Sequence, residues 1–231
     1  MNYFCILSAG KGIRLGFNKN KGLINLAGKT ILGLNLEKLN EADQIDKILV
    51  VTNSESKDEI DSELKKYKSE KLYSKSILGG YERQDSALAG LKFFKDNSLK
   101  ERDIVLFHNV ANPFFSISEL NDLILNAKTF NAAVLAQKMK DTIRKVDENL
   151  NSSGVIPRKD LYRMQTPQAL EAMCAVKSFK KAYDDKYLGT DDVELAENAG
   201  FNVKIVECSD SNFKITTKED YYLAEYILEK K

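Results

Sequence analysis

Short apolar runs alternate with amphipathic segments along most of this chain. The apolar runs predict strands at 3–7, 46–52, 73–78, 103–108, 132–137 and 202–207. The amphipathic segments predict helices near 30–40, 56–67, 84–95, 116–129, 169–183, 190–199 and 218–229. Such alternation is typical of a mainly parallel, twisted sheet with helices on both faces, so we expect a Rossmann-like α/β fold. Ligands of such folds bind beyond the carboxyl ends of the strands.

Several helices carry recognisable start or stop signals. Ser56 and Ser116 each begin an S-x-x-E pattern, which is typical of a capping box, and Thr190 and Thr217 are candidate N-caps. Gly200 stands where a glycine would end the helix before it.

The segment 138–166 interrupts this alternation. Residues 142–146 alternate with period two, and a polar turn at 147–154 precedes another extended stretch. We therefore expect a single domain over 1–231 from which 138–166 protrudes as a β-arm. Because a lone hairpin is marginally stable in water, we expect the arm to pack on a second subunit and form a homodimer.

A glycine-rich loop, residues 8–16, directly follows the first predicted strand. Its sequence is Ser-Ala-Gly-Lys-Gly-Ile-Arg-Leu-Gly, and glycines of this kind let backbone N–H groups approach a ligand closely. Three cations, Lys11, Arg14 and Lys21, stand in or just after the loop, so we expect it to bind a polyanion such as a triphosphate. A plain tight turn is the alternative interpretation of the same glycines.

Two other nucleotide-binding motifs fit the sequence less well. The glycine spacing is G-x-G-x-x-x-G rather than G-x-G-x-x-G, and the second predicted strand leads to Asn53 without the acidic residue that binds the ribose of a dinucleotide. Residues 28–30 resemble the end of a P-loop, but Leu23 stands where that motif needs its first glycine. The pattern therefore disfavours a hydride-transfer enzyme, and Thr30 is better interpreted as a helix cap.

A second candidate binding segment, residues 79–86, opens a predicted helix. The unpaired N–H groups of a helix N-terminus attract anions and hydroxyl-rich ligands. Arg83 and Ser86 lie one turn apart and are candidates to hold a base or a ribose, while capping by Ser86 or Asp85 is the alternative. The single histidine, His108, ends a predicted strand, and we interpret it as a structural hydrogen-bonding residue.

The composition excludes several classes of function. The 231 residues include 35 Lys and Arg and 34 Asp and Glu, so the net charge of +1 leaves no footprint for general nucleic-acid binding. No apolar run approaches the roughly 20 residues that span a bilayer, and the N-terminal run ends too early for a signal peptide. The cysteines, Cys5, Cys174 and Cys208, have no metal-ligand spacing, which favours reduced, buried thiols in a cytoplasmic protein.

Taken in order, these motifs resemble those of the 2-C-methyl-D-erythritol 4-phosphate cytidylyltransferases and their alditol-phosphate cytidylyltransferase relatives, over nearly the whole chain. The matching segments are 8–16, Lys21, 28–32, 79–86, 141–142, 165–168, 190–192 and 212–216. The resemblance implies a nucleotidyltransferase that joins CTP and 2-C-methyl-D-erythritol 4-phosphate to give CDP-methylerythritol and pyrophosphate, with Mg²⁺ or another divalent cation as cofactor. In-line attack by the acceptor phosphate would then depend on positioning and electrostatic stabilisation.

The resemblance also implies roles for individual residues. The expected catalytic residues are Arg14 and Lys21, which match cations on the triphosphate, and Lys214 on the acceptor side. The expected nucleotide-binding residues are Ser8, Ala9, Gly10, Gly12, Gly80, Arg83, Ser86 and Asn109. The expected acceptor-binding residues are Asn112, Thr142, Arg158 and Thr166. Thr142 and Arg158 match arm residues that in the family reach into the neighbouring subunit's site.

Three positions depart from the family pattern. Asn109 stands in place of an acid associated with the metal and the ribose, Asn112 in place of an arginine that faces the acceptor phosphate, and Asn20 in place of a proline. An amide oxygen is a poorer Mg²⁺ ligand than a carboxylate, so Asn109 should bind metal only weakly. The missing guanidinium removes a bidentate phosphate clamp. Two alternatives follow: ribitol 5-phosphate or another polyol phosphate as acceptor, or a CTP-binding homologue without turnover.

Overall fold

A seven-stranded sheet with the order β11-β7-β10-β6-β1-β4-β5 forms the centre of the computed structural model, which describes residues 1–10, 12, 16 and 19–230. Parallel pairs join β1 (Asn2–Ser8) to β4 (Lys47–Thr52) and β6 (Ile104–Asn109), β4 to β5 (Ile77–Leu78), and β7 (Ala132–Lys138) to β11 (Val203–Glu207). One long strand, β10 (Tyr162–Glu171), lies antiparallel between β6 and β7. The predicted mainly parallel sheet is confirmed.

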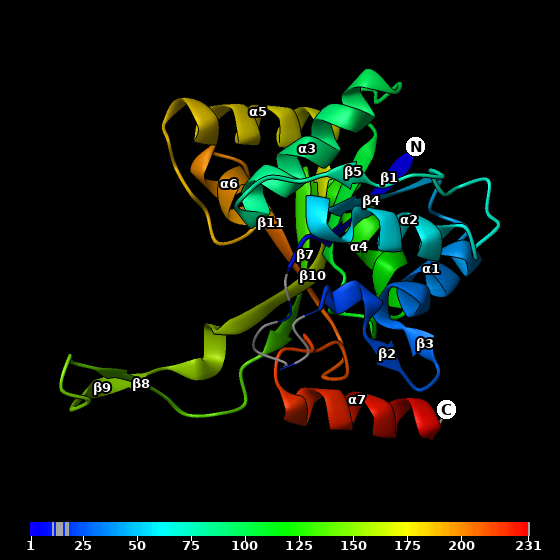
Figure 1. Cartoon of the computed structure of the whole chain (residues 1–231). Coiled ribbons are helices and arrows are strands. Elements are labelled where there is room, and N and C mark those ends of the chain that lie inside the picture. The colour runs from blue at the N-terminus through cyan, green and yellow to red at the C-terminus, as the bar shows by residue number, and fades with distance from the viewer. Residues whose placement is uncertain (11, 13–15, 17–18, 231) are drawn as a thin grey trace.

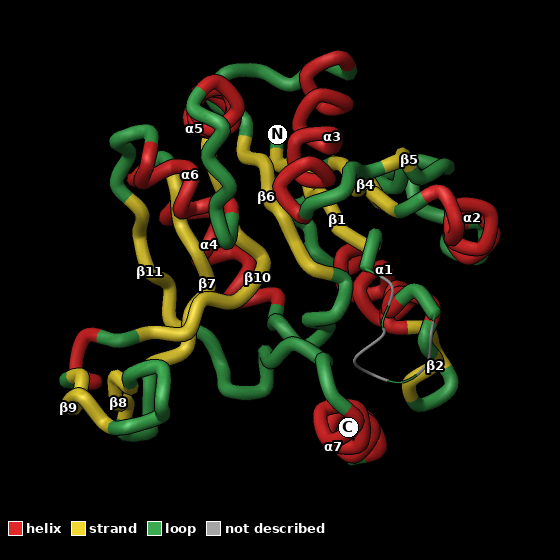
Figure 2. Tube along the Cα trace, turned by 60° about the vertical axis from the view of Figure 1, so that its left-hand side comes forward, coloured by secondary structure: helices red, strands yellow, loops and turns green. Residues whose placement is uncertain are grey.

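Helices cover both faces of this sheet (Figures 1 and 2). One hydrophobic core includes side chains from α1 (Ile31–Glu41), α2 (Lys57–Leu64), α4 (Ile117–Phe130) and α7 (Lys218–Glu229). The other core includes side chains from α3 (Arg83–Asp96), α5 (Ala172–Asp184) and α6 (Asp192–Asn198). The central strand β1 serves both cores because its side chains alternate: Phe4 packs in the first core and Cys5 in the second.

Short elements complete the chain. A small hairpin joins β2 (Asn25–Leu26) to β3 (Lys29–Thr30), and 3-10 helices occur at η2 (Lys21–Leu23), η3 (Ser54–Ser56) and η4 (Arg158–Asp160). The strand predicted at 73–78 is much shorter than expected, since only its last two residues pair with β4.

Four of the predicted helix signals are confirmed. The Ser116 hydroxyl accepts a hydrogen bond from Glu119 N at 3.1 Å within a full capping box, and Thr217 caps α7 in the same way. Thr30 caps α1 by accepting from a backbone N–H. Gly200 follows α6 with φ of +85°, a conformation that glycine adopts without strain.

Two predicted caps are wrong. The side chain of Ser56 makes no cap hydrogen bond, because a 3-10 turn precedes α2 and the Asn53 side chain accepts from Ser56 N at 2.8 Å instead. The cap of α6 is Asp191 rather than Thr190, and its carboxylate accepts from Glu194 N at 2.9 Å.

Strand β10 is the main element that the sequence pattern missed. The helix predicted over 169–183 begins only at Ala172, and the residues before it pair with β6 and β7. Pro167 does not end this strand, although a proline has no N–H to donate to a ladder. The register with β7 shifts between Met164 and Gln168, so the missing N–H of the proline falls in this irregularity and costs no ladder hydrogen bond.

A two-stranded antiparallel hairpin of β8 (Ile143–Val146) and β9 (Ser152–Ile156) extends away from the body of the protein (Figure 1). Its turn is held by Asp147, whose carboxylate accepts from the backbone N–H of Asn149 and Asn151 at 2.9 and 2.8 Å. The predicted β-arm thus has a counterpart, which we call the arm. Residues 162–166 belong to the central sheet and connect the arm directly to it.

Candidate functional site

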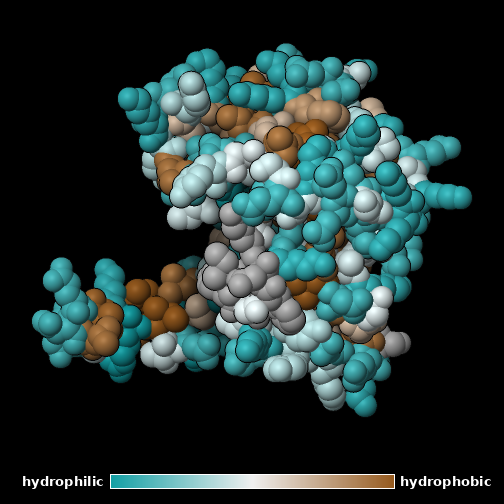
Figure 3. Space-filling model, in the orientation of Figure 1, coloured by the Kyte–Doolittle hydropathy of each residue, from teal (hydrophilic) through white to brown (hydrophobic). Residues whose placement is uncertain are grey.

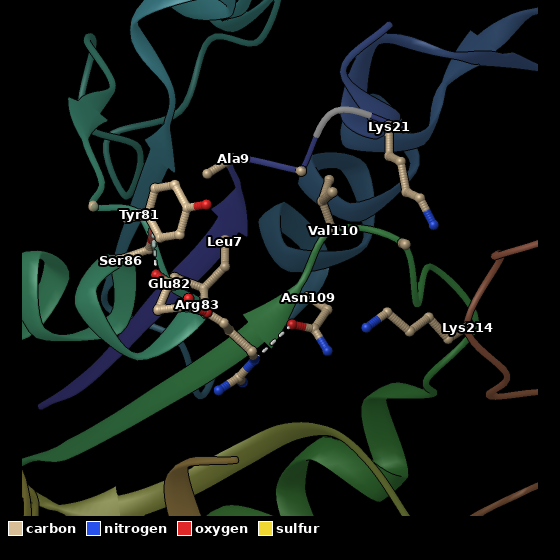
Figure 4. A pocket seen from close by; sticks show the side chains of 13 residues that line it. Leu7, Ala9, Lys21, Tyr81, Glu82, Arg83, Ser86, Asn109, Val110 and Lys214 are labelled. Carbon is tan, nitrogen blue, oxygen red and sulfur yellow. Dashed lines mark hydrogen bonds between the residues drawn. The ribbon is translucent and has the colours of Figure 1, made fainter. Parts of the chain in front are cut away.

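A cavity of about 260 Å³ lies at the carboxyl ends of β1 and β6, beside the N-terminus of α3 (Figure 4). Its position is the one expected for a ligand site in a fold of this class. The residues lining it are Leu7, Ala9, Gly10, Lys21, Gly80, Tyr81, Glu82, Arg83, Ser86, Asn109, Val110, Ala111 and Lys214. We call it the first cavity.

A second cavity of about 280 Å³ adjoins the first. It is lined by Arg83, Asn109, Asn112, Met164, Gln165, Thr166, Gln168, Thr190, Asp191 and Lys214. Arg83, Asn109 and Lys214 line both cavities. Two ligands bound side by side would therefore meet at these three side chains.

Arg83 is held in this shared wall by a buried carboxylate. Its Nη2 lies 2.6 Å from Oδ2 of Asp192, the first residue of α6, whose side chain is almost fully buried. Burial alone would lower the pKa of the guanidinium, but the charge and hydrogen bond of Asp192 outweigh it and raise the pKa of Arg83. The cation is therefore permanent and fixed in place.

Asn109, the last residue of β6, is held through both its side chain and its backbone. Its Oδ1 accepts a hydrogen bond from Nε of Arg83 at 2.9 Å (Figure 4). Its backbone N–H donates to Oγ1 of Thr166 at 3.2 Å. These contacts bring β6, α3 and β10 together at the junction of the two cavities.

The two lysines of the site come from opposite ends of the sequence. Lys21 is buried, and its ammonium donates to the carbonyl of Ile215 at 2.9 Å. The backbone of Ile215 in turn donates to the carbonyl of Ala111, beyond the end of β6, at 2.8 Å. The segment that carries Lys214 is thereby fixed beside the N-terminal loop.

Asn20, which stands where the family pattern has a proline, caps the 3-10 helix η2 that begins at Lys21. Its Oδ1 accepts from the Ser8 hydroxyl and from the Gly22 backbone, both at 2.9 Å, and its Nδ2 also contacts Thr52. The side chain thus connects the end of β1 to the first turn of η2. These hydrogen bonds hold the backbone at a position where a proline ring would restrict it.

Two other predicted nucleotide-binding residues, Ser8 and Gly12, do not line the first cavity. Ser8 is fully buried and bonds to Asn20 rather than facing the cavity. Gly12 has φ of +63°, and a Cβ there would lie 2.3 Å from the carbonyl oxygen of Lys19, so glycine is required. Arg14, predicted as catalytic, lies outside the described residues.

On the acceptor side the structure brings Asn112 and Thr166 to the second cavity. Asn112 is buried, and its Nδ2 donates to Oε1 of Gln165 at 3.1 Å. Gln168 accepts at its Oε1 from the backbone N–H of Asp192 at 2.9 Å, and it donates to Asp191. The wall is therefore rich in amides and hydroxyls.

Two predicted acceptor-binding residues lie on the arm, outside both cavities. Thr142 is exposed just before β8, and Arg158 is exposed in η4, where its guanidinium donates to the carbonyl of Lys140. Within one chain they do not meet Lys214.

The sequence pattern did not predict that Asp192 pairs with Arg83. It also did not indicate Tyr81 and Glu82, which line the first cavity beside Arg83. The acidic run at 191–194 was the available signal for a buried ion pair, but nothing in the sequence assigned its partner. Tyr81 is almost fully exposed although it lines the first cavity.

His108 has the structural role that we expected. It is fully buried, and its Nε2 lies 2.9 Å from Oδ1 of Asn35. The amide of Asn35 already donates to the carbonyls of Ile31 and Val110, so its oxygen accepts and the Nε2 of His108 donates. Burial, followed by the charges of Lys38 and Arg83, holds the pKa of His108 well below its usual range.

The donor atoms around Asn109 do not fit a metal held by the protein. Within the described part of the chain, no three His, Cys, Asp or Glu side chains gather into a group that could hold an ion. The Oδ1 of Asn109 accepts from a guanidinium, and Asp192 is paired with the same cation. Oxygen atoms engaged with a positive charge are poorly placed to coordinate another.

The three cysteines are free thiols, and two of them are buried as the composition predicted. Cys5 and Cys174 are buried and Cys208 is half-buried, all three without disulfide partners. Burial raises the pKa of both the Cys174 and the Cys208 thiol to about 11. Among the described residues, no helix combines the length and apolar character needed to cross a bilayer.

The fold and the two adjoining cavities define the α/β class of proteins that bind a ligand beyond the carboxyl ends of parallel strands. The model of the family described as "IspD: 2-C-methyl-D-erythritol 4-phosphate cytidylyltransferase" matches residues 3–230, and the chain belongs to this family. The family resemblance expected from the motifs is therefore confirmed.

Relatives and solved structures agree with this assignment. A 2-C-methyl-D-erythritol 4-phosphate cytidylyltransferase of Halalkalibacterium halodurans is 37% identical over 232 residues, covering 100% of this chain and 99% of the relative. One of Clostridium novyi is 38% identical over 232 residues, covering 99% and 96%. The crystal structure of 4-diphosphocytidyl-2C-methyl-D-erythritol synthase from Anaerococcus prevotii is similar with a TM-score of 0.84 at 28% identity, covering 99% of this chain and 96% of that one.

Proposed function

We propose that this protein transfers the cytidylyl group of CTP to 2-C-methyl-D-erythritol 4-phosphate, forming CDP-methylerythritol and pyrophosphate. The observation that carries the proposal is the pair of adjoining cavities with Arg83, Asn109 and Lys214 in their shared wall, in a chain of this family. One cavity suits each substrate, and a reaction between two phosphates needs both substrates in contact.

The proposed reaction is a direct displacement. CTP occupies the first cavity, with its base and ribose against the end of β1 and the start of α3, and with its triphosphate near Lys21. An oxygen of the acceptor phosphate attacks the α-phosphorus, the bond from that phosphorus to the oxygen bridging the β-phosphate breaks, and pyrophosphate leaves with the electron pair. Lys21, Lys214 and Arg83 stabilise the charge that spreads over the phosphate oxygens in the transition state.

In the proposed reaction the divalent cation is bound to the nucleotide rather than to the protein. Mg²⁺ usually keeps several waters and is bound largely by substrate phosphates in phosphate-transfer sites. Because the described residues offer no protein cage, we propose that Mg²⁺ arrives on the triphosphate of CTP, where it would neutralise phosphate charge.

We also propose that the protein is a homodimer assembled through the arm. The arm and its base expose four apolar side chains, and apolar surface is visible along it in Figure 3. These are Val146 and Val155, each more than half exposed, with Leu150 and Met164. Burial of this surface by a second copy would bring that copy's Thr142 and Arg158 toward the second cavity.

Incubation of the purified protein with CTP, Mg²⁺ and 2-C-methyl-D-erythritol 4-phosphate tests the function, with pyrophosphate release as the readout. Steady turnover that depends on both substrates is expected. CTP binding without turnover on any acceptor would instead indicate a homologue that has lost catalysis. Sedimentation of the intact chain and of a Val146→Ser, Val155→Ser variant tests the dimer, which the variant should weaken.

One observation favours an alternative acceptor substrate. Asn112, a neutral amide bonded to Gln165, stands in the second cavity where the family pattern has an arginine. A site with fewer fixed cations would hold the acceptor more through its hydroxyls, as suits ribitol 5-phosphate or another polyol phosphate. Comparing kcat/KM for the two acceptors in parallel decides between them, and faster turnover of methylerythritol phosphate removes this alternative.

A further inference from the structure

The amide of Asn109 is locked in one orientation. The Nε of Arg83 can only donate a hydrogen bond, so the Asn109 atom 2.9 Å away must be the oxygen. Arg83 cannot turn away, because its Nη2 is paired with the buried carboxylate of Asp192 at 2.6 Å. The three residues thus form a row of contacts from α6 through α3 to the end of β6, in which Arg83 donates to both Asp192 and Asn109.

The consequence is that Asn109 presents its NH₂ group to the junction of the cavities. Asn109 lines both cavities, and Figure 4 shows its nitrogen on the side that faces Lys214. Within the described part of the chain, this Nδ2 has no hydrogen-bond partner, although the Oδ1 and the backbone N–H of the same residue are both engaged. An amide donor beside an ammonium group is suited to an anionic oxygen and unsuited to a cation.

We propose that Asn109 is a hydrogen-bond donor to a phosphate oxygen at the point where the two substrates meet, and that it is not a metal ligand. The inference rests on the proposed function and assigns one atom of the same site. Nδ2 and the ammonium of Lys214 approach the phosphate oxygens together, and both groups strengthen their contacts as negative charge grows during transfer. The oxygen belongs to the α-phosphate of CTP or to the acceptor phosphate.

The substitution Asn109→Asp tests this directly because it keeps the shape of the side chain. One carboxylate oxygen still accepts from Nε of Arg83, while the group facing the cavities changes from a donor to a negatively charged acceptor. The matched variant Asn109→Ala removes the donor without adding charge. Asn109 is only partly buried, so both variants should fold, which thermal unfolding verifies.

Calorimetric titration with CTP and Mg²⁺, without acceptor, gives a readout independent of turnover. If the oxygen belongs to CTP, affinity falls in the order wild type, Ala, Asp, with Asp at least tenfold weaker than wild type. If it belongs to the acceptor, CTP affinity is unchanged and the KM for the acceptor phosphate rises at least tenfold in the Asp variant. Asp variants that bind and turn over as well as or better than wild type, with a lower Mg²⁺ requirement, would overturn the proposal in favour of metal coordination. The wild-type affinity for CTP separately tests the proposed function.

Discussion

Arg83 and Asp192 form an ion pair across 109 residues of sequence, with 2.6 Å between Nη2 and Oδ2. Arg83 begins α3 and lines both cavities, whereas Asp192 begins α6 and is inaccessible to solvent. The pair therefore connects two helices on the same face of the sheet and fixes the wall between the two cavities.

Asp192→Asn should lower the free energy of unfolding by about 3 kcal/mol, because it leaves a largely buried guanidinium without its counter-charge. The double variant Arg83→Met, Asp192→Leu should lose less than the single one, since it buries no unpaired charge. Urea unfolding of the wild type, of Arg83→Met, of Asp192→Leu and of the double variant gives the coupling energy. Additive losses would show that the two side chains do not interact.

Lys21→Ala should reduce kcat at least a hundredfold while the protein stays folded, because a cation at the proposed triphosphate position is lost. Lys19→Ala is the matched control: it is two residues away, exposed, and contacts only Glu59 at 3.6 Å among its described ion-pair partners. Its activity should match the wild type. Equal activity of Lys21→Ala and wild type would mean that the triphosphate lies elsewhere.

Stability should fall as the pH drops below about 6.5, the usual pKa of a histidine in an unfolded chain. The pKa of His108 is lowered in the folded protein, so the unfolded chain binds a proton that the native state does not. The contribution is fully present above pH 6.5 and is lost toward the lower folded pKa, with a slope of about 1.4 kcal/mol per pH unit. His108 is the only histidine, so His108→Gln should remove the slope between pH 7 and 5.5 in urea unfolding.

Gly90→Ala should destabilise the protein although alanine favours helix. A Cβ at Gly90 would lie 2.4 Å from Sγ of Cys5, which is buried beneath α3. Overpacking of this kind costs about 1–3 kcal/mol, which exceeds the gain of up to about 1 kcal/mol in helix propensity. Cys5→Ala removes the sulfur, so Gly90→Ala should cost much less in that background. The same loss in both backgrounds would exclude the contact as its cause.

The sequence predicted the fold well where an element depends on its own side chains. The apolar runs of β1, β4, β6 and β7 are buried on both faces and could be recognised without their neighbours. Strand β10 was missed because its first half is mostly polar and is followed by a proline, Pro167. Its pairing depends on β6 and β7 and on a register shift, which no local pattern encodes.

The residues of the candidate site were also predicted only in part. Motif order brought out Lys21, Arg83, Asn109 and Lys214, and all four line the first cavity. The pairing of Arg83 with Asp192 was not foreseeable, because it depends on how α3 and α6 pack. The orientation of the Asn109 amide followed only from the geometry, since an asparagine in a sequence offers a donor and an acceptor equally.

Leu7 and Lys214 both line the first cavity, and Lys21 donates to the carbonyl of Ile215, which follows Lys214. During translation, the glycine loop and β1 leave the ribosome long before the segment that carries Lys214. A nascent chain therefore has no complete site until that segment has emerged and docked beside Ala111. Catalytic competence would then arise only after that segment has docked, rather than gradually with chain growth.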